Sequence, residues 1–519
     1  MATSAVVVLA IGGGVVALGL QDPVGPTRTV AAPAVEVAAA PVSLICPGPV
    51  RLPASSGDAG FDPAPVGAIT SVRGATTGIG SGGGLGTAAP GLLTDLATGG
   101  TLARIAPSGR GAAAATVTAP SGPLQLTADP VDGRVARAAG TSTSLVTAGD
   151  LRGLAVTTCT EAGTDAWLVG GSTALSSTAL LTLVNPGTTA ASVDLEIWGP
   201  NGPAELSGGS ALLVAPHAQR QLLLSGIAAE QRRIVVHVSA TGGVVAASLQ
   251  DDELRGLTPG GLTFVSAGAA PSTRQVVTGI TVPSSAIDDT DQAVLRLVAP
   301  GTSDTKATIS LLGPDGVVPL PGAESVDLTA GSVIDVPLAG IPAGSYTAVV
   351  QAPVPVLAAA MITRVGGTGQ LENERVIDRA WAASGAVGTG GVAPLPSAPG
   401  VTSTIVLAGV GRSAVDGGGD ATGTLRAFAA DGSVVGDMTV TVPAGQTVTV
   451  PVSDLSADAV TVDLVPAADA TGADAELAWA VVATVTQNDG QLVAVLTPTP
   501  PQSATPSVRV RQGTTVGLP

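Results

Sequence analysis

The sequence has few of the side chains on which most enzymes and nucleic-acid-binding proteins depend. Its 519 residues include 2 histidines and 2 cysteines, and Lys306 is the only lysine. The 22 basic residues stand against 39 acidic ones, which gives a formal net charge of −17. Binding to nucleic acid needs clustered positive charge that displaces counterions, so this composition excludes a nucleic-acid partner.

Aromatic residues are also scarce, at 2% of the chain, and they are the side chains that usually line sugar clefts. The chain instead has Gly 70, Pro 40 and a hydrophobic content of 45%, which is too apolar for a disordered chain. Ala, Val, Leu, Thr and Gly dominate, and long runs of strong helix formers are missing. This composition predicts an all-β protein of many short strands, and the length predicts three or four domains.

The clearest targeting signal is the uncharged run AVVVLAIGGGVVALGL, from Ala5 to Leu20. A bilayer span takes about 20 apolar residues, so the run lies between a signal-peptide core and a thin transmembrane helix. We interpret it as a membrane helix, because Ala17 and Gly19 form only a weak cleavage site; a buried core element is the alternative. The chain is therefore expected to be a single-pass cell-membrane protein with its bulk extracytoplasmic.

The residues around this run complete the expected N-terminal region. Asp22 to Pro41 are rich in Pro, Ala and Val without a core pattern, which predicts a semi-extended stalk. No basic leader precedes the apolar run, so we expect the true start of the protein to lie upstream of Met1.

Cys46 and Cys159 are the two cysteines, and exported proteins meet an oxidising compartment. We therefore predict a disulfide between them, with two isolated buried thiols as the alternative. A metal site is not predicted, because neither cysteine has a close CxxC partner and His217 and His237 lie far away in sequence.

Internal repetition is the most informative feature of the middle of the chain. Residues 181–202, LTLVNPGTTAASVDLEIWGPNG, and residues 295–316, LRLVAPGTSDTKATISLLGPDG, share nine identical positions in register. A weaker third copy begins at Ile405 and ends at Gly432. Because the shared positions include turn glycines and prolines, we predict three related domains, with Gly202, Gly316 and Gly432 in equivalent turns.

Alternation within each copy predicts strands. In VDLEIW, from Val193 to Trp198, apolar and acidic residues alternate with the period of a half-buried strand. Several such strands per copy favour tandem β-sandwich (Ig-like) domains over a propeller, whose blades repeat at about 40 to 50 residues. The predicted organisation is a membrane anchor or signal segment (1–20), a Pro/Ala-rich linker (21–40), an N-terminal β domain (41–168), three β-sandwich repeats (169–280, 281–395 and 396–500) and a C-terminal tail (501–519).

Several of these segments together resemble a known family. The runs GDLRGLAVTTC, WLVGGST, LVNPG and IWGPNG, preceded by an apolar segment, a Pro/Ala stalk and ICPGP, are similar to an uncharacterised family of actinobacterial cell-envelope proteins classified as a domain of unknown function. The similarity is densest from Gly149 to Gly202. It implies an N-terminal anchor and an extracytoplasmic repeat region, and it implies no activity or catalytic residue. The absent basic leader departs from the family pattern.

Motifs with a chemical mechanism are hard to find in this sequence. The run GIGSGG, Gly78 to Gly83, has the GxGxxG spacing, but further glycines and Pro90 follow it, which favours a loop over a nucleotide site. The sequence contains no GxSxG, HExxH or Walker motif, and both histidines are placed in predicted strands. No catalytic, metal or cofactor-binding residue is therefore predicted.

Acidic clusters are the remaining candidates for a site. They could bind Ca²⁺ through oxygen atoms, but none has the spacing of a known calcium loop, so solvated loop carboxylates are expected. The clusters are Asp251, Asp252 and Glu253; Asp288, Asp289 and Asp291; and Asp416 and Asp420.

Two classes of function fit this sequence. The favoured one is a non-catalytic, membrane-anchored structural or interaction module of the cell envelope, with an envelope protein or glycan as its partner. The alternative is an extracytoplasmic hydrolase that acts on envelope glycan or peptide through carboxylates of the N-terminal domain.

Overall fold

The structure is a computed structural model, and it is all-β, as the composition predicts. It describes residues 34–36, 38–52, 67–79, 83–208, 210–283, 286, 289–320, 322–369, 374–412, 418–467, 475–502 and 507–509. Within these ranges helix is confined to single turns such as η3 (Leu224–Gly226) and α2 (Val452–Leu455). None of the helices in the described ranges is long and apolar enough to cross a membrane. The predicted membrane segment, residues 5–20, lies outside the described residues.

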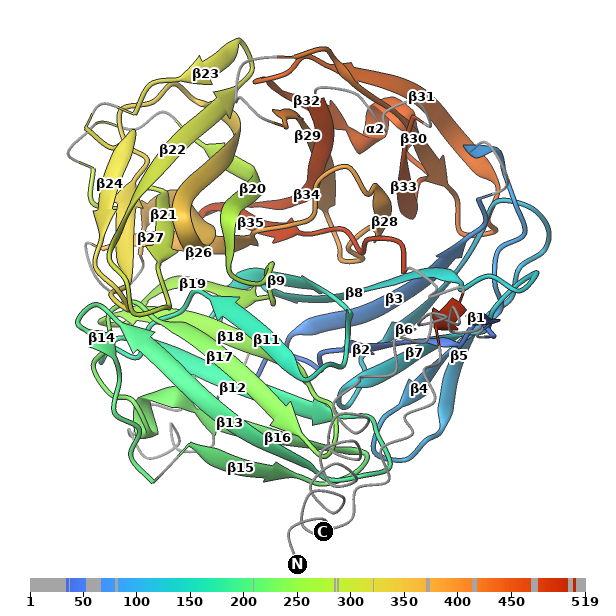
Figure 1. Ribbon diagram of the computed structural model, residues 1–519, viewed down its shortest axis with the longest axis horizontal. Helices are drawn as coiled ribbons and strands as arrows, with labels where there is room; N and C mark the ends of the chain where they lie inside the picture. The colour runs from blue at the N-terminus through green and yellow to red at the C-terminus, as the bar shows by residue number, and fades with distance from the viewer. Residues whose placement is uncertain are drawn as a thin grey trace, which may run out of the picture. The chain divides into compact units, whose positions relative to one another are not determined.

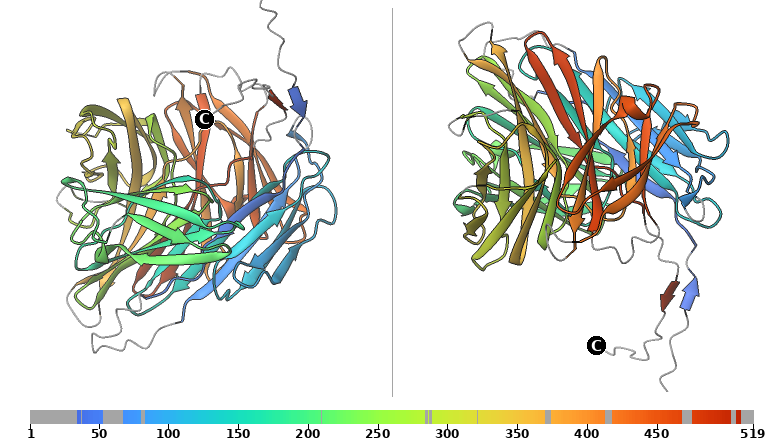
Figure 2. Two further views of the ribbon diagram at one scale, coloured as in Figure 1. Left: turned by 60° about the horizontal axis from the view of Figure 1, so that its bottom comes forward. Right: turned by 90° about the horizontal axis from the view of Figure 1, so that it is seen from above.

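The chain divides into two units. The smaller one comprises Met1–Ala39 and Ala504–Pro519. In it, strand β1 (Ala34–Glu36) pairs antiparallel with strand β36 (Ser507–Arg509), and the two lie side by side in Figure 2. Part of the predicted linker is therefore strand, paired with the predicted C-terminal tail. The larger unit, Ala40–Ser503, is called the body below.

The body consists of four modules, each with two antiparallel sheets, which in module 3 are joined into one eight-stranded sheet through a shared strand. Module 1 comprises β2 (Val42–Cys46), β3 (Ile69–Thr77), β4 (Gly91–Asp95), β5 (Thr101–Ile105), β6 (Ala112–Thr118), β7 (Leu124–Ala128), β8 (Arg137–Val146), β9 (Gly153–Thr158) and β10 (Thr160–Glu161). Module 2 comprises β11 (Asp165–Val169), β12 (Ser177–Asn185), β13 (Ala191–Gly199), β14 (Gly202–Pro203), β15 (Ala211–Val214), β16 (Ala218–Leu223), β17 (Val235–Thr241), β18 (Ala246–Arg255) and β19 (Thr258–Val265).

Modules 3 and 4 complete the body. Module 3 comprises β20 (Ser272–Val282), β21 (Val294–Val298), β22 (Thr305–Gly313), β23 (Gly316–Val318), β24 (Ser325–Leu328), β25 (Ile334–Pro337), β26 (Gly344–Thr368) and β27 (Arg375–Ala383). Module 4 comprises β28 (Gly391–Pro394), β29 (Val401–Gly411), β30 (Ala421–Phe428), β31 (Val434–Val442), β32 (Thr447–Pro451), β33 (Thr461–Pro466), β34 (Ala475–Gln487) and β35 (Gly490–Leu496).

All four modules share one strand order. Each module has eight strand positions, of which one sheet has the order 1-6-3-4 and the other the order 5-2-7-8, as in β28-β33-β30-β31 and β32-β29-β34-β35 of module 4. The fourth position is divided between β14 and β15 in module 2 and between β23 and β24 in module 3, and β10 follows the eighth strand of module 1. In module 3 the sixth and seventh strands are one continuous strand, β26, which joins both sheets. The sequence repeat covers modules 2 to 4, and module 1 is a fourth copy of the same layout that the repeat did not reveal.

The predicted repeat positions fall at equivalent places in these modules. Leu181, Leu295 and Ile405 lie on the second strands β12, β21 and β29, each of which pairs with the fifth and seventh strands of its module. The three turn glycines, Gly202, Gly316 and Gly432, follow the third strands and have φ values of +112°, +121° and +86°. Such values favour glycine, which explains why this residue repeats.

Sheet pairing separates the modules slightly earlier than the predicted boundaries. The first strands β11, β20 and β28 begin before the boundaries predicted after residues 168, 280 and 395. Each of them pairs with the sixth strand of its own module. Local sequence did not reveal this, because the partner strand lies far downstream.

Each module buries a core between its two sheets. Strand β13 alternates as predicted, with Val193, Leu195 and Ile197 buried and Asp194 and Glu196 exposed. The core of module 1 includes the two cysteines, and those of modules 2 to 4 extend into neighbouring modules. Figure 2 shows the sheets from two sides.

The four modules are arranged around the middle of the body (Figure 1), and their eighth strands contact one another. Strand β9 contacts β19 and β35, and β27 contacts the same two strands. Module 4 therefore packs against module 1 as well as module 3. Because these eighth strands contact strands of other modules, burial of the centre depends on all four modules together.

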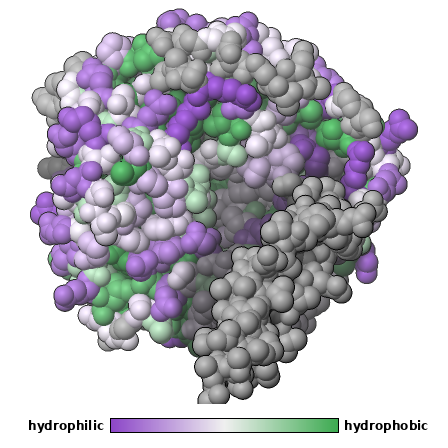
Figure 3. All heavy atoms as spheres, in the orientation of Figure 1, coloured by the Kyte–Doolittle hydropathy of each residue, from purple (hydrophilic) through white to green (hydrophobic). Residues whose placement is uncertain are grey.

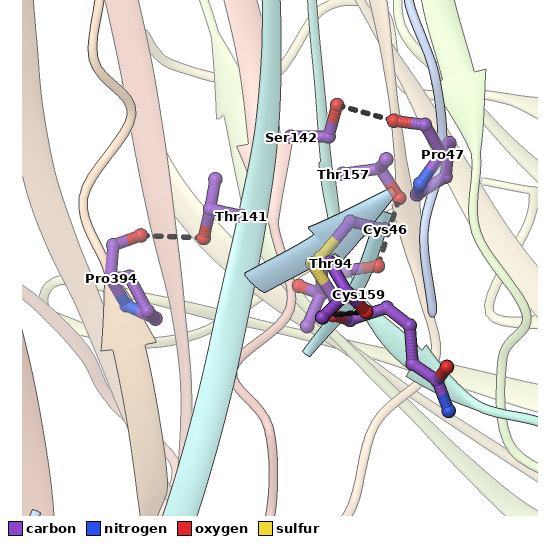
Figure 4. Close-up of a disulfide and its surroundings, with 10 residues drawn as sticks. Cys46, Pro47, Thr94, Thr141, Ser142, Thr157, Cys159 and Pro394 are labelled. Atoms are coloured by element: carbon purple, nitrogen blue, oxygen red, sulfur yellow. Dashed lines mark hydrogen bonds between the residues drawn. A yellow bond between two sulfur atoms is a disulfide. The ribbon is translucent and has the colours of Figure 1, made fainter. Parts of the chain in front are cut away.

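The predicted disulfide is confirmed. Cys46, at the end of β2, is bonded to Cys159, which directly follows β9, and the two Cα atoms are 4.2 Å apart (Figure 4). The bond links the two sheets of module 1 across a sequence separation of 113. Nearby, the buried hydroxyl of Thr141 donates to the carbonyl of Pro394 at 2.6 Å, which ties module 1 to module 4 (Figure 4).

Candidate functional site

In every module, the chain after the eighth strand crosses back to the first sheet. There it pairs antiparallel with a residue of the first strand, so that four equivalent segments surround the centre of the body. The pairs are Ile45 with Thr160, Leu168 with Ala267, Val277 with Ser384, and Val392 with Thr499. These crossing segments line a groove of about 700 Å³, which we call the axial groove.

Hydroxyl, proline and small apolar residues make up most of the groove wall. Hydroxyl groups come from Thr158, Thr160, Ser266, Ser384, Thr389, Thr497 and Thr499, and prolines from Pro41, Pro498, Pro500 and Pro501. Among the described lining residues, Glu161 alone carries an ionisable side chain and Trp479 is the one aromatic residue. Residues at both ends of the body, Ala40 and Gln502, also line the groove.

Some of these hydroxyl groups form hydrogen bonds with other residues of the protein. Thr158 donates to the carbonyl of Thr497, which joins modules 1 and 4. The Ser266 hydroxyl lies 2.8 Å from that of Thr157, which joins modules 1 and 2. Thr499 is only 7% exposed, and its Oγ1 has no hydrogen-bond partner among the residues that the structure describes.

His237 lies on the outer face of module 2, on β17. Its Nδ1 is 2.8 Å from Glu196 Oε2, its Nε2 is 2.7 Å from Asp165 Oδ1, and its ring stacks on Trp167 with centroids 3.9 Å apart. Both ring nitrogens of His237 therefore face a carboxylate. The cluster links the three neighbouring strands β11, β17 and β13 of one sheet.

His217 does not lie in a strand, contrary to the expectation for both histidines. It occupies the exposed turn between β15 and β16 and has φ +50°. A hairpin turn accounts for this conformation, which a strand would not allow. The two histidines are therefore on different elements, and the structure brings neither to the axial groove.

The expectation of solvated carboxylates is wrong for Asp251, Asp252 and Glu253. They belong to strand β18, and Asp251 and Asp252 are 1% and 4% exposed. The Nε1–H of Trp381 in module 3 donates to Asp251 at 2.9 Å, and Arg379 pairs with Glu253 at 2.6 Å. The cluster is buried because module 3 packs on this strand, which the sequence of module 2 alone does not reveal.

The other acidic candidates are spread over separate places. Asp291 pairs with Arg255 at 2.5 Å, whereas Asp289 and Asp420 are exposed. Asp288 and Asp416 lie outside the described residues. Of the GIGSGG run, Gly78, Ile79 and Gly83 are described, and no long helix follows them, as expected for a loop. The described residues contain no group of three or more metal-ligating side chains arranged to hold an ion.

Two buried carboxyl groups have strongly shifted pKa values. Burial raises the pKa of Asp252 to about 7, against the hydrogen bond that it accepts from Gln250 at 2.9 Å. Burial also raises the pKa of Asp378 to about 7, although the N–H of Val493 donates to it at 2.6 Å and Arg152 is nearby. Both groups lie between modules and not in the axial groove.

Asp378 lies where the four eighth strands meet. It belongs to β27 and bonds to Val493 on β35. The backbone N–H of Leu262 on β19 also acts on this carboxyl group as a hydrogen-bond donor that lowers its pKa. A Cβ atom on Gly153 of β9 would come within 2.9 Å of its Oδ1, so β9 passes close by. One carboxyl group therefore lies in contact with strands of all four modules.

The sequence does not reveal the axial groove, because the groove residues come from four modules. Each contributing segment by itself is a short stretch of small and hydroxyl residues after a strand. The one signal present is that hydroxyls recur after these strands, in VTTCT from Val156, FVSAGA from Phe264, AASGA from Ala382 and LTPTP from Leu496.

Comparison with known proteins identifies a family. A family model described as "Family of unknown function (DUF5719)" matches residues 108–453, which is 346 of 519 residues. The chain belongs to this family. The match extends from the loop before β6 to the start of α2, so it includes modules 2 and 3 entirely.

Comparisons with curated proteins and with solved structures identify no further relative that supports an argument. No curated protein matches the chain. A solved structure titled "Crystal Structure of Thermotoga maritima 1070" is 14% identical, with a TM-score of 0.18 over 22% of this chain and 95% of that one. A second, titled "Biofilm associated protein - BSP domain", is 9% identical, with a TM-score of 0.12 over 93% of this chain and 100% of that one. At these TM-scores neither likeness supports an argument.

Proposed function

We propose that this family member is a non-catalytic scaffold and interaction module of the cell envelope. In this proposal its modules are tandem β-sandwich (Ig-like) domains, held outside the cytoplasm on a Pro/Ala stalk by a single membrane helix. The uncharged run from Ala5 to Leu20 supports the membrane anchor. The Cys46–Cys159 bond supports a location in an oxidising compartment.

The closure of the four modules around their eighth strands is the observation that carries this proposal. Charged groups buried at the module boundaries pair with one another. Arg379 pairs with Glu253 at 2.6 Å between modules 2 and 3, and Arg137 pairs with Asp463 between modules 1 and 4. Ion pairs between modules fix the position of one module relative to the next. Such rigidity suits a scaffold that presents a binding surface.

Cell fractionation with external protease tests the location. We expect the full chain in the membrane fraction and open to protease added to intact cells, whereas a variant lacking residues 5–20 should leave that fraction. A full chain found in the cytoplasm would contradict the proposal.

The non-catalytic role has its own test. His217→Ala, His237→Ala and alanine variants of exposed Asp289 and Asp420 should leave any envelope phenotype unchanged, whereas deletion of one whole module should abolish it. If a single carboxylate substitution removes function while the protein stays folded and exported, the chain is the hydrolase.

A further inference from the structure

We propose that the axial groove is a binding site for an uncharged oligosaccharide. This inference deepens the proposed interaction role, on which it rests, by naming the class of ligand and the place where it binds. The groove volume of about 700 Å³ lies within the range of about 300 to 1,000 Å³ that is usual for small-ligand sites.

The charge of the groove favours a neutral ligand. Glu161 is the one ionisable residue among the described lining residues, and it lies on the short edge strand β10. A phosphorylated or carboxylated ligand would meet no cation among the described lining residues, and the protein has a net charge of −17. A cationic ligand buried in the groove would need a buried anionic partner, whereas the carboxylate of Glu161 is exposed.

Two residues that line the groove each have a buried oxygen that lacks a hydrogen-bond donor. Thr499 Oγ1 and Gln502 Oε1 both have no partner among the described residues. A buried polar atom without a partner costs free energy, and most such atoms in proteins are paired. Ligand hydroxyl groups would supply the missing donors, and the Thr499 hydroxyl can donate in return.

The wall favours a sugar over an extended peptide. A peptide that binds through its main chain needs backbone N–H groups opposite its carbonyls. The four prolines in the wall, Pro41, Pro498, Pro500 and Pro501, have none. Hydroxyl side chains, which donate and accept like the hydroxyls of a sugar, provide most of the polar lining instead.

The small number of aromatic side chains in the groove limits the affinity expected for an oligosaccharide. Trp479, 6% exposed, is its one described aromatic residue, so little ring surface is available for stacking against a sugar. We therefore expect dissociation constants on the order of 1 mM for a single trisaccharide.

Titration of the purified full chain tests this proposal, with maltotriose, cellotriose and N-acetylchitotriose as neutral probes and trigalacturonate as the charged comparison. Ligand-observed NMR should show binding of at least one neutral probe, and trigalacturonate should bind at least about tenfold more weakly. Thr499→Val should weaken that binding by about tenfold, the effect of one lost hydrogen bond. The same variant should not lower the melting temperature, because the Thr499 hydroxyl has no partner among the described residues.

Thr461→Val is the matched control, because Thr461 of module 4 is buried and its Oγ1 has no partner among the described residues, but it does not line the groove. It should leave binding unchanged, whereas Ala386→Trp, which fills the groove, should abolish binding. The proposal is overturned if no neutral probe binds, if binding survives Thr499→Val and Ala386→Trp, or if a neutral Thr/Pro peptide binds there in place of every sugar. Since the assay uses purified protein, such a failure leaves the membrane location to its separate fractionation test.

Discussion

At the scale of the residue, Asp378 links all four modules through a carboxyl group whose pKa is raised by burial to about 7, from 3.8 in an unfolded chain. Between pH 4 and pH 7 the folded protein therefore binds more protons at this group than the unfolded one, and stability falls as pH rises through this window. A shift of about 3 pKa units corresponds to at most about 4 kcal/mol. Asp252 contributes in the same direction.

We therefore expect the free energy of unfolding to be higher at pH 5 than at pH 8, as measured by urea titration. Asp378→Asn cannot ionise, and its unfolding free energy should change less between the two pH values and exceed that of the parent at pH 8. A parent protein that becomes more stable from pH 5 to pH 8, with the variant showing the same slope, would contradict this assignment.

At the scale of the element, strand β8 passes directly over the disulfide. A Cβ atom at Gly140 of β8 would lie 2.4 Å from Cys159 Sγ and 3.1 Å from Cys46 Sγ. Gly140→Ala should therefore destabilise the protein by about 1 to 3 kcal/mol or leave free thiols, which non-reducing mass measurement detects. Gly122→Ala is the control in the same module, because a Cβ there meets nothing within 4 Å. Equal stability of the two variants would mean that β8 does not constrain the bond.

At the scale of the whole molecule, closure of module 4 on module 1 depends on Asp463. This buried carboxylate accepts hydrogen bonds from Arg137 and from Thr77 at 2.7 Å. Arg137→Met leaves it without its cation and should cost about 3 to 5 kcal/mol, with faster proteolysis between modules. Lys306→Met removes an exposed pair with Asp327 and should cost less than about 1 kcal/mol. Comparable losses in both variants would show that the interface does not hold the modules together.

The sequence alone determined the all-β class, the equivalent strands at Leu181, Leu295 and Ile405, and the Cys46–Cys159 pair. These depend on local alternation, on turn glycines at repeated spacings and on there being one possible pairing of two cysteines. Each of these constraints acts within a short stretch of chain or on a few residues, so it leaves a direct trace in the sequence.

Only the tertiary structure decided that module 1 is a fourth copy, that Asp251 and Asp252 are buried, and that Thr160, Ser384 and Thr499 surround one groove. Each of these depends on contacts between strands that are far apart in the chain. A strand pattern specifies which face is apolar but not which module covers it. Burial of a polar residue at such a contact therefore leaves no periodic signal, and the crossing segments show their common role only when the four eighth strands meet.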